Sequence, residues 1–213
     1  MPLETIDQTT SNLAVVILAG GRGMRLGERD KALCDLGGVT LLQHCLARLK
    51  AQNGPVALSA NGDLERFSDF KFPVIPDTLG MDFGPLAGIL TAMDWAHTIG
   101  HTKVMTIAVD TPFFPQDLAL RLQTASNSHP ITLAATRDTD DTLWPHPTFG
   151  IWQTGLRYVL RQDLQNGTRK VMTWARAQGV GLVEFSTRPY DPFFNINTPD
   201  DLNQAHVLLA KRT

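Results

Sequence analysis

Residues 15–33 read VVILAGGRGMRLGERDKAL. An apolar run of strand length leads into a glycine-rich turn that carries Arg22 and Arg25, and Asp30 and Lys31 follow where the next apolar stretch begins. Glycines let main-chain N–H groups approach a ligand closely, and Arg and Lys neutralise its negative charge. We therefore expect a buried strand that ends in a phosphate-binding turn, and this combination suits a triphosphate.

Two familiar phosphate motifs do not match this turn. The P-loop requires Gly-Lys-Ser/Thr, whereas Lys31 is preceded by Asp30 and followed by alanine. The dinucleotide fingerprint requires Gly-x-Gly-x-x-Gly, and the spacing of Gly21, Gly23 and Gly27 is one residue too long. The turn is therefore not a P-loop, and an NAD site is disfavoured. A tight connection with solvated charges remains an alternative.

The length and composition are those of a globular domain. Its 213 residues are 43% hydrophobic and 19% charged, with a net charge of −2, so a core can form without disulfides or a structural metal. Neither a disordered chain nor a broadly basic nucleic-acid binder has this balance. We expect a flexible tail over residues 1–12 and a single domain over residues 13–213.

The same composition bears on compartment and redox state. No signal-peptide pattern and no apolar run of membrane-spanning length occurs in the sequence. We therefore expect a cytoplasmic protein that binds neither membrane nor nucleic acid. We also expect it to be a monomer. Cys34 and Cys45 lack the Cys-x-x-Cys spacing, so reduced core cysteines are the better interpretation.

Apolar runs of strand length alternate with stretches of helical spacing. The predicted strands cover residues 14–19, 55–60, 72–75, 103–109, 131–135, 147–152 and 181–185. Residues 40–50 and 86–95 have helical spacing, Pro115 opens another helix, and Thr198 and Pro199 open the last. This alternation predicts an α/β fold whose mostly parallel sheet has helices on both faces. Ligands bind beyond the carboxyl ends of the strands in such folds.

Asp110 directly follows the fourth predicted strand, in the sequence Val109-Asp110-Thr111-Pro112. A carboxylate beside a triphosphate suits Mg²⁺, because this ion keeps several waters and takes one or two protein carboxylates plus phosphate oxygens. The alternative is that Asp110 only caps the following turn. The phosphate-binding turn favours the metal role.

Ser59 and Asn61 follow the second predicted strand, Asp77 follows the third, and Gly84 opens the segment GPLAG. A carboxylate such as Asp77 can accept paired hydrogen bonds from the N1–H and 2-amino group of guanine. Glycines allow backbone to lie close to a base or ribose. For Ser59 and Asn61 a simple turn explains the residues as well as a ligand does.

Further polar residues near the last strands and helices are candidates for ligand binding. Asn195 and Asn197 alternate before the last helix and would share one side of an extended segment. Arg169 and Lys170 could bind an anionic acceptor, although a solvated helix start explains them almost as well. His146, held between two prolines, is as consistent with a packed loop residue as with a ligand.

These groups indicate attack on the α-phosphate of a nucleoside triphosphate. The sequence offers no obvious Ser-His-Asp or Cys-His set. A phosphate monoester needs no general base, because its second pKa is about 6 and it is mostly dianionic at neutral pH. The protein would then supply in-line positioning and charge stabilisation through Arg25 and Lys31.

A series of motifs occurs in order over about residues 14 to 210. They are Leu18-Ala19-Gly20-Gly21, Arg25, Asp30-Lys31, Pro76-Asp77, Gly84-Pro85-Leu86-Ala87-Gly88, Asp110-Thr111-Pro112 and Asn195-Ile196-Asn197-Thr198-Pro199. Together they resemble the molybdenum cofactor guanylyltransferases. The resemblance implies a single-domain, Rossmann-like, three-layer α/β/α nucleotidyltransferase fold. It also implies GTP as donor, the terminal phosphate of Mo-bound molybdopterin as acceptor, Mg²⁺ as cofactor and transient contact with molybdoenzymes or their chaperones.

The resemblance and the strand-end reasoning together define the candidate site. The candidate catalytic residues are Arg25, Lys31 and Asp110, Asp110 is the candidate metal ligand, and the candidate binding residues are Leu18, Ala19, Gly20, Gly21, Lys31, Ser59, Asn61, Asp77, Gly84, Asp110, Asn195 and Asn197. Where family members have Asn-Ala-Asn, this chain has Ser59-Ala60-Asn61, which puts one nucleotide contact in doubt.

Three alternatives stay open at this point. Cytidylyltransferases that act on the same acceptor have a loop resembling Leu-Ala-Ala-Gly, and Gly20 favours the larger guanine because a methyl group would narrow the room beside the base. Sugar-phosphate nucleotidyltransferases share a phosphate acceptor. A nucleotide-binding regulatory module without catalysis would tolerate loss of Asp110, and the presence of both Lys31 and Asp110 argues against it.

Overall fold

The computed structural model of the chain describes residues 13–20, 30–50, 54–79 and 83–211. Its strands are β1 Ala14–Leu18, β2 Asp35–Leu36, β3 Val39–Thr40, β4 Val56–Ser59, β5 Val74–Ile75, β6 Lys103–Ala108, β7 Ile131–Arg137, β8 Leu143–Gln153 and β9 Val180–Phe185. Its helices are η2 Lys31–Leu33, α1 Leu41–Arg48, η3 Glu65–Phe67, α2 Pro85–Thr98, α3 Leu118–Ala125, η5 Thr154–Leu156, α4 Arg157–Gln165, α5 Val171–Gln178 and α6 Pro199–Ala210, where η marks a 3₁₀ helix. The tail expected over residues 1–12 lies outside the described residues.

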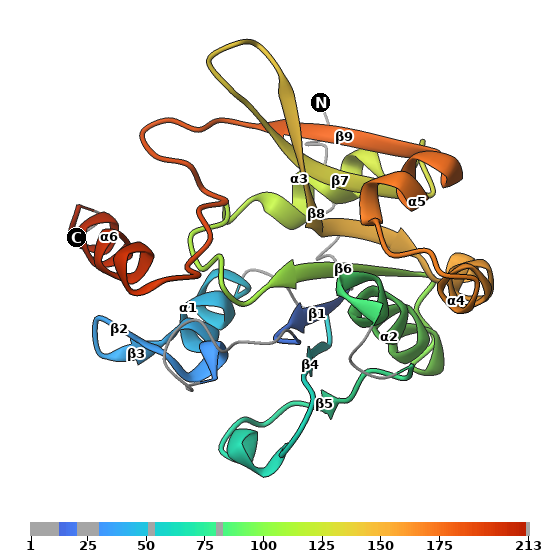
Figure 1. Ribbon diagram of the computed structural model, residues 1–213, viewed down its shortest axis with the longest axis horizontal. Helices are drawn as coiled ribbons and strands as arrows, with labels where there is room; N and C mark the ends of the chain where they lie inside the picture. The colour runs from blue at the N-terminus through green and yellow to red at the C-terminus, as the bar shows by residue number, and fades with distance from the viewer. Residues whose placement is uncertain (1–12, 21–29, 51–53, 80–82, 212–213) are drawn as a thin grey trace, which may run out of the picture.

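Within these residues, seven strands form one sheet in the order β5-β4-β1-β6-β8-β7-β9. β1 pairs in parallel with β4 and β6, β4 with β5, and β7 with β9. Only β8 runs against its two neighbours, β6 and β7. The sheet is thus mostly parallel, as the alternation of strands and helices predicts (Figure 1).

β1 lies in the interior of the sheet and is buried on both faces. Successive strand residues point to opposite faces, so Val15 and Ile17 join one apolar cluster while Val16 and Leu18 join another. The first cluster includes residues of α1 and α3, and the second includes residues of α2, α4 and α5. These helices form the two outer layers, which is why residues 14–18 form a continuous apolar run rather than an alternating one.

The last helix packs beside the first hairpin. A third buried cluster contains Leu36 of β2, Leu41 of α1, Ala205 of α6, and Ile196 from the segment before α6. Thr198 caps α6 and forms a capping box with Asp201, as its sequence predicts. Figure 1 shows α6 next to α1 and the β2–β3 hairpin. This packing brings the segment before α6 back to the carboxyl end of the central strands.

β8 is longer than the sequence predicts, and it contains two prolines. The register between β7 and β8 shifts after Leu133, and Pro145 pairs with Ala135 beyond this irregularity. The pairing of β8 with β6 covers only residues 150–153. Pro145 and Pro147 therefore lie beyond the part of β8 that is paired on both sides, where a missing N–H costs little.

Other differences are smaller. The strand predicted over residues 72–75 is reduced to Val74–Ile75, and the helix predicted from Pro115 begins at Leu118 after a turn. Cys34 and Cys45 are both buried, as expected. Among the described helices, none is long and apolar enough to cross a membrane.

Candidate active site

The carboxyl ends of three neighbouring strands meet at one edge of the sheet. The Ala19 N–H donates to the Ser59 carbonyl at 2.8 Å, and the Val109 N–H donates to the Leu18 carbonyl at 3.1 Å. β1 therefore ends level with β4 on one side and β6 on the other. This alignment brings the candidate residues of three separate sequence segments to the same edge, as expected for a parallel sheet.

Asp77 lies on the β4 side of this edge and is held by two neighbours. Ser59 Oγ donates to Asp77 Oδ1 at 3.0 Å, and Asn61 Nδ2 donates to Asp77 Oδ2 at 2.9 Å. The Asp77 N–H donates in turn to Asn61 Oδ1 at 2.9 Å. Ser59 is buried. Ser59 and Asn61 thus fix the orientation of the Asp77 carboxylate, and their predicted contact with the nucleotide stays a prediction.

Two glycines keep the space around Asp77 open. A Cβ on Gly20 would lie 3.5 Å from Asn61 Nδ2 and 3.6 Å from Asp77 Oδ2. A Cβ on Gly88 would lie 3.1 Å from Leu18 Cδ2 and 3.9 Å from Asp77 Oδ1. Gly88 belongs to the first turns of α2, so this helix can approach the end of β1 closely. Gly84 caps α2 with φ +64°, a conformation that favours glycine.

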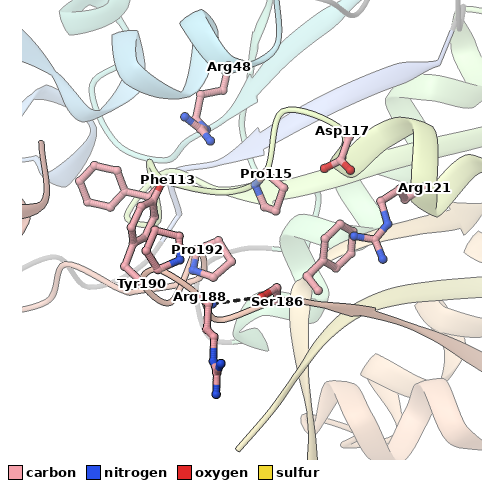
Figure 2. A pocket seen from close by; sticks show the side chains of 11 residues that line it. Arg48, Phe113, Pro115, Asp117, Arg121, Ser186, Arg188, Tyr190 and Pro192 are labelled. Atoms are coloured by element: carbon pink, nitrogen blue, oxygen red, sulfur yellow. Dashed lines mark hydrogen bonds between the residues drawn. The ribbon is translucent and has the colours of Figure 1, made fainter. Parts of the chain in front are cut away.

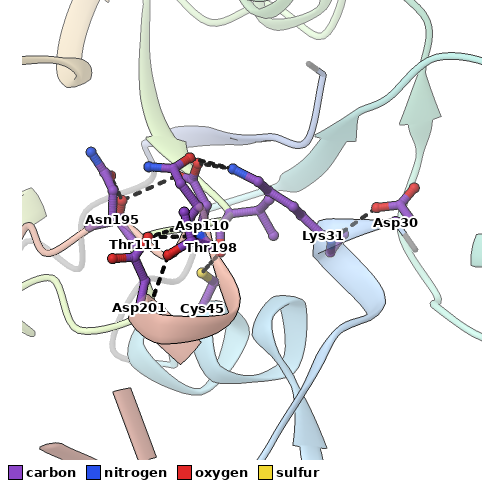
Figure 3. Close-up of polar contacts among 11 residues, drawn as sticks. Asp30, Lys31, Cys45, Asp110, Thr111, Asn195, Thr198 and Asp201 are labelled. Carbon is purple, nitrogen blue, oxygen red and sulfur yellow. Dashed lines mark hydrogen bonds and ion pairs between the residues drawn. The ribbon is translucent and has the colours of Figure 1, made fainter. Parts of the chain in front are cut away.

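Lys31 and Asp110 form an ion pair on the β6 side. Lys31 Nζ lies 3.1 Å from Asp110 Oδ2 and donates to Asn197 Oδ1 at 2.5 Å (Figure 3). The Lys31 and Asp110 side chains are 19% and 24% exposed. The structure therefore brings three candidate residues together from segments far apart in the sequence.

The segment before α6 is tied to Asp110 and its neighbour. The Ile196 N–H donates to the Asp110 carbonyl at 2.8 Å, and Thr111 Oγ1 donates to Asn195 Oδ1. Asp201 Oδ2 accepts the N–H groups of Asn197 and Thr198 at 2.9 and 2.8 Å, and these bonds lower the pKa of Asp201. Asn195 and Asn197 thus lie at the edge where they were expected, beside the metal candidate.

The Asp110 carboxylate has the chemistry of a Mg²⁺ ligand. It is a hard oxygen donor at a partly exposed position, and its Oδ1 lies 3.3 Å from Thr111 Oγ1. In the part of the chain that the structure describes, no three His, Cys, Asp or Glu side chains could together hold a metal ion. One carboxylate still fits Mg²⁺, because this ion completes its shell with phosphate oxygens and water.

Other candidates have different positions. Gly21 and Arg25 lie outside the described residues. The Arg169 guanidinium stacks 4.4 Å from the ring centroid of Phe83, the residue before Gly84. His146 is half-buried: its Nε2 is 2.8 Å from Thr136 Oγ1 and its ring stacks on Phe193 at 4.1 Å.

Arg66 is a residue at this edge that sequence reasoning missed. Its guanidinium bonds to Asp30 and to the Asn61 carbonyl. Asp30 lies 36 residues before it, so no spacing pattern could have paired them. The one sequence feature that indicates a role for Arg66 is its position a few residues after the end of the strand predicted over residues 55–60.

A separate pocket of about 240 Å³ lies beside the start of α3 (Figure 2). Its lining includes Arg48, Arg121 and Arg188, but Figure 2 shows the Arg188 side chain directed away from Arg48. The Arg121 guanidinium is engaged with the Glu184 carbonyl at 2.6 Å and the Phe185 ring at 4.1 Å. None of the candidate residues lines this pocket, so it is no part of the predicted site.

Comparison with known proteins supplies the family. The family model of the MobA-like NTP transferase domain matches residues 15–180. The molybdenum cofactor guanylyltransferase of Mesorhizobium japonicum is 44% identical over 207 residues, which cover 95% of this chain and 98% of the relative. The chain belongs to the molybdenum cofactor guanylyltransferases. The enzyme of that name from Nitrobacter hamburgensis is 40% identical over 198 residues, with 92% and 93% of the two chains covered.

Solved structures agree on the fold of this guanylyltransferase family member. The molybdopterin-guanine dinucleotide biosynthesis protein A of Archaeoglobus fulgidus has a TM-score of 0.72 at 24% identity, with 93% and 100% of the two chains covered. A nucleotidyl transferase of Methanothermobacter has a TM-score of 0.71 at 18% identity, with 95% and 100% covered. The expected nucleotidyltransferase fold and the expected family are confirmed, and the regulatory module without catalysis is excluded.

Proposed function

We propose that this guanylyltransferase transfers GMP from GTP to the terminal phosphate of Mo-bound molybdopterin. The products are the molybdopterin guanine dinucleotide cofactor and pyrophosphate. The observation that carries the proposal is that two polar clusters lie on either side of Gly20 at one edge of the sheet. Asp77, held by Ser59 and Asn61, lies on the β4 side, and the Lys31–Asp110 pair lies on the β6 side. The first group suits a base and the second suits phosphates.

Guanine recognition is assigned to Asp77. Each carboxylate oxygen has two lone pairs, so Asp77 can accept from Ser59 and Asn61 and still accept from a ligand. Guanine presents two donors side by side, N1–H and the 2-amino group. Adenine and cytosine present a ring nitrogen acceptor at the corresponding position, which would face the carboxylate unfavourably. The carboxylate at Asp77 therefore favours guanine.

Lys31 is assigned to the phosphates. An oxygen of the acceptor phosphate attacks the α-phosphorus of GTP, and the bond from that phosphorus to the bridging oxygen of pyrophosphate breaks. Because the acceptor is a phosphate monoester with a second pKa of about 6, no protein base is needed. The Lys31 ammonium stabilises charge on the reacting phosphate and the leaving group. Arg25 is proposed to do the same.

Asp110 is assigned as the protein ligand of Mg²⁺. When bound, this ion supplies charge stabilisation at the phosphate oxygens. The contacts of Asp110 with Lys31 and of Lys31 with Asn197 set where the ammonium lies before substrate arrives. Asn195 and Asn197 are proposed to border the acceptor, since they lie beside the Lys31–Asp110 pair. Arg169 is proposed to bind an anionic acceptor, and Gly84 is proposed to let backbone lie close to the base or ribose.

The remaining parts of the proposal concern the cell. We expect the chain to act as a monomer in the cytoplasm and to hand its product to molybdoenzymes or their chaperones in transient contacts. A net charge of −2 gives no broad electrostatic attraction to nucleic acid or anionic membranes.

The test is pyrophosphate release in the presence of Mg²⁺ and molybdopterin acceptor with GTP, CTP, ATP or UTP in parallel. Release with GTP that depends on the acceptor is the expected result. Release with CTP but not GTP would overturn the assignment of guanine, and equal release with all four would remove Asp77 from base recognition. No release with any nucleotide would contradict the proposed reaction.

A further inference from the structure

Arg66, in η3, contacts both halves of the candidate site. Its Nε donates to Asp30 Oδ2 at 2.6 Å, and its Nη2 donates to the Asn61 carbonyl at 2.9 Å. Its Nη1 donates to the Asp63 carbonyl, and its guanidinium carbon lies 4.4 Å from the centroid of the Phe67 ring. All three guanidinium nitrogens are therefore engaged, and the group is held against a buried aromatic ring.

The partners of Arg66 are the supports of the two substrate-facing groups. Asp30 directly precedes Lys31 and caps η2 by accepting the Ala32 N–H at 2.9 Å. Asn61 holds Asp77 through its side chain. One planar group thus connects the helical turn that presents the lysine with the loop that orients the carboxylate.

Arginine is the side chain suited to this position. Its rigid fork donates in several fixed directions at once, whereas lysine is a flexible point charge. The Arg66 and Asp30 side chains are only 25% and 19% exposed, so the contact is partly shielded from water. A lysine at position 66 would keep the positive charge and lose the fixed geometry.

We propose that Arg66 is a positioning residue that couples guanine recognition to phosphate placement. It acts through Asp30 on Lys31 and through Asn61 on Asp77, and it touches neither substrate. This inference rests on the proposed function. Because binding of a remote part of the substrate can be used to orient the reacting part, recognition of the base at Asp77 raises kcat only if the two halves are rigidly connected.

The substrate pair that tests this coupling is GTP and ITP, which lacks the 2-amino group. In the wild-type chain, GTP is expected to exceed ITP in kcat as well as in kcat/KM. In Arg66→Lys, kcat/KM for GTP is expected to fall about 10²-fold, the loss typical of a small misplacement of reacting groups. The kcat ratio of GTP to ITP is expected to approach one, because base recognition no longer places the α-phosphate.

Two further variants make the test specific. Asp30→Asn keeps an oxygen for the Ala32 N–H but loses the ion pair, so it should lower the kcat ratio of GTP to ITP as Arg66→Lys does. The double variant should be no worse than the more impaired single variant, since both changes break one connection. Arg121→Lys is the matched control: Arg121 also bonds a backbone carbonyl and stacks on a ring, but at Glu184 and Phe185.

Turnover is measured with GTP and ITP for each variant, alongside urea unfolding. If the wild-type chain transfers GMP and Arg66→Lys leaves the kcat ratio of GTP to ITP unchanged, the positioning role of Arg66 is overturned while the proposed function stands. A loss of kcat/KM in the double variant equal to the product of the two single-variant losses would overturn the positioning role too. If Arg66→Lys does not fold, Asp30→Asn decides by the same ratio. Absence of guanylyl transfer by the wild-type chain would refute the proposed function and this inference with it.

Discussion

Gly20→Ala separates the fold of this enzyme from its choice of base. A methyl group at this position would lie 3.5 Å from Asn61 Nδ2 and 3.6 Å from Asp77 Oδ2, which are ordinary van der Waals distances. Gly20 is not among the glycines with positive φ, so alanine can adopt its backbone conformation. We expect the free energy of unfolding to stay the same or rise by about 0.4–1 kcal/mol, as for other compatible Gly→Ala changes.

Under the proposed assignment of Asp77, the same methyl group would occupy the space through which a guanine edge reaches this carboxylate. One added or missing methyl group in a binding site changes discrimination by about 1–3 kcal/mol, or about 10–200-fold. We therefore expect kcat/KM for GTP to fall by this factor. A pyrimidine needs less room, so kcat/KM for CTP should change little and the GTP-to-CTP preference should fall by about the same factor.

The assay is pyrophosphate release with GTP and CTP in parallel, together with urea unfolding of the variant. Gly155→Ala is the matched control, because a Cβ there meets no atom within 4 Å and Gly155 lies in η5. An unchanged preference for GTP over CTP in Gly20→Ala would refute the reasoning. So would a large loss of stability, since it would mean that Gly20 serves the fold.

Three further predictions concern single side chains. Asp77→Asn replaces an acceptor with a donor, so kcat/KM for GTP should fall about 10²–10⁴-fold, the effect of two hydrogen bonds to a charged group, as measured by steady-state kinetics. Asp110→Asn should lower kcat about 10³-fold or more and abolish its dependence on Mg²⁺ concentration, because several kcal/mol of charge stabilisation are lost. Burial lowers the pKa of His146, and Asp191 opposes this shift. In His146→Gln, the free energy of unfolding measured in urea should therefore fall less steeply as the pH is lowered.

The direction of the His146 effect follows from proton binding. The unfolded chain takes up the proton near pH 6.5, whereas the folded chain takes it up only at lower pH. The contribution of neutral His146 is therefore complete above about pH 6.5 and is lost as pH falls toward the folded pKa, by at most about 1.4 kcal/mol per pH unit. Equal pH dependence of unfolding in wild type and His146→Gln would contradict the His146 prediction. Mg²⁺-dependent turnover by Asp110→Asn would contradict the assignment of Asp110 as metal ligand. Normal GTP kinetics in Asp77→Asn would contradict the role of Asp77 in base recognition.

The sequence predicts the frame of the site well, because a parallel sheet converts strand ends into spatial neighbours. Leu18, Ser59 and Asp110 could be assigned to one edge from the apolar runs before them, and the structure aligns those strands. Asn197 could be assigned to that edge from the resemblance to the family. Its contact with Lys31 could not, since it depends on where α6 packs.

The connections between the groups were beyond sequence reasoning for a physical reason. Arg66 bonds Asp30 across 36 residues, and such a contact depends on how η3 lies against the sheet rather than on any local pattern. The hydrogen bond from the Ser59 hydroxyl to Asp77 could not be predicted from the sequence either, and the contact of Ser59 with the nucleotide stays a prediction. The extent of β8 was underestimated because proline is normally excluded from the middle of a sheet.

The central claim is that the GMP unit moves from GTP to a phosphate acceptor at this edge of the sheet. The most direct measurement uses GTP labelled with radioactive phosphorus either at the α-phosphate or at the γ-phosphate, with Mg²⁺ and molybdopterin acceptor. The account predicts that α-label appears in the dinucleotide cofactor and γ-label in pyrophosphate. Recovery of the γ-label in inorganic phosphate, or of the α-label in free GMP with the acceptor unchanged, would contradict it.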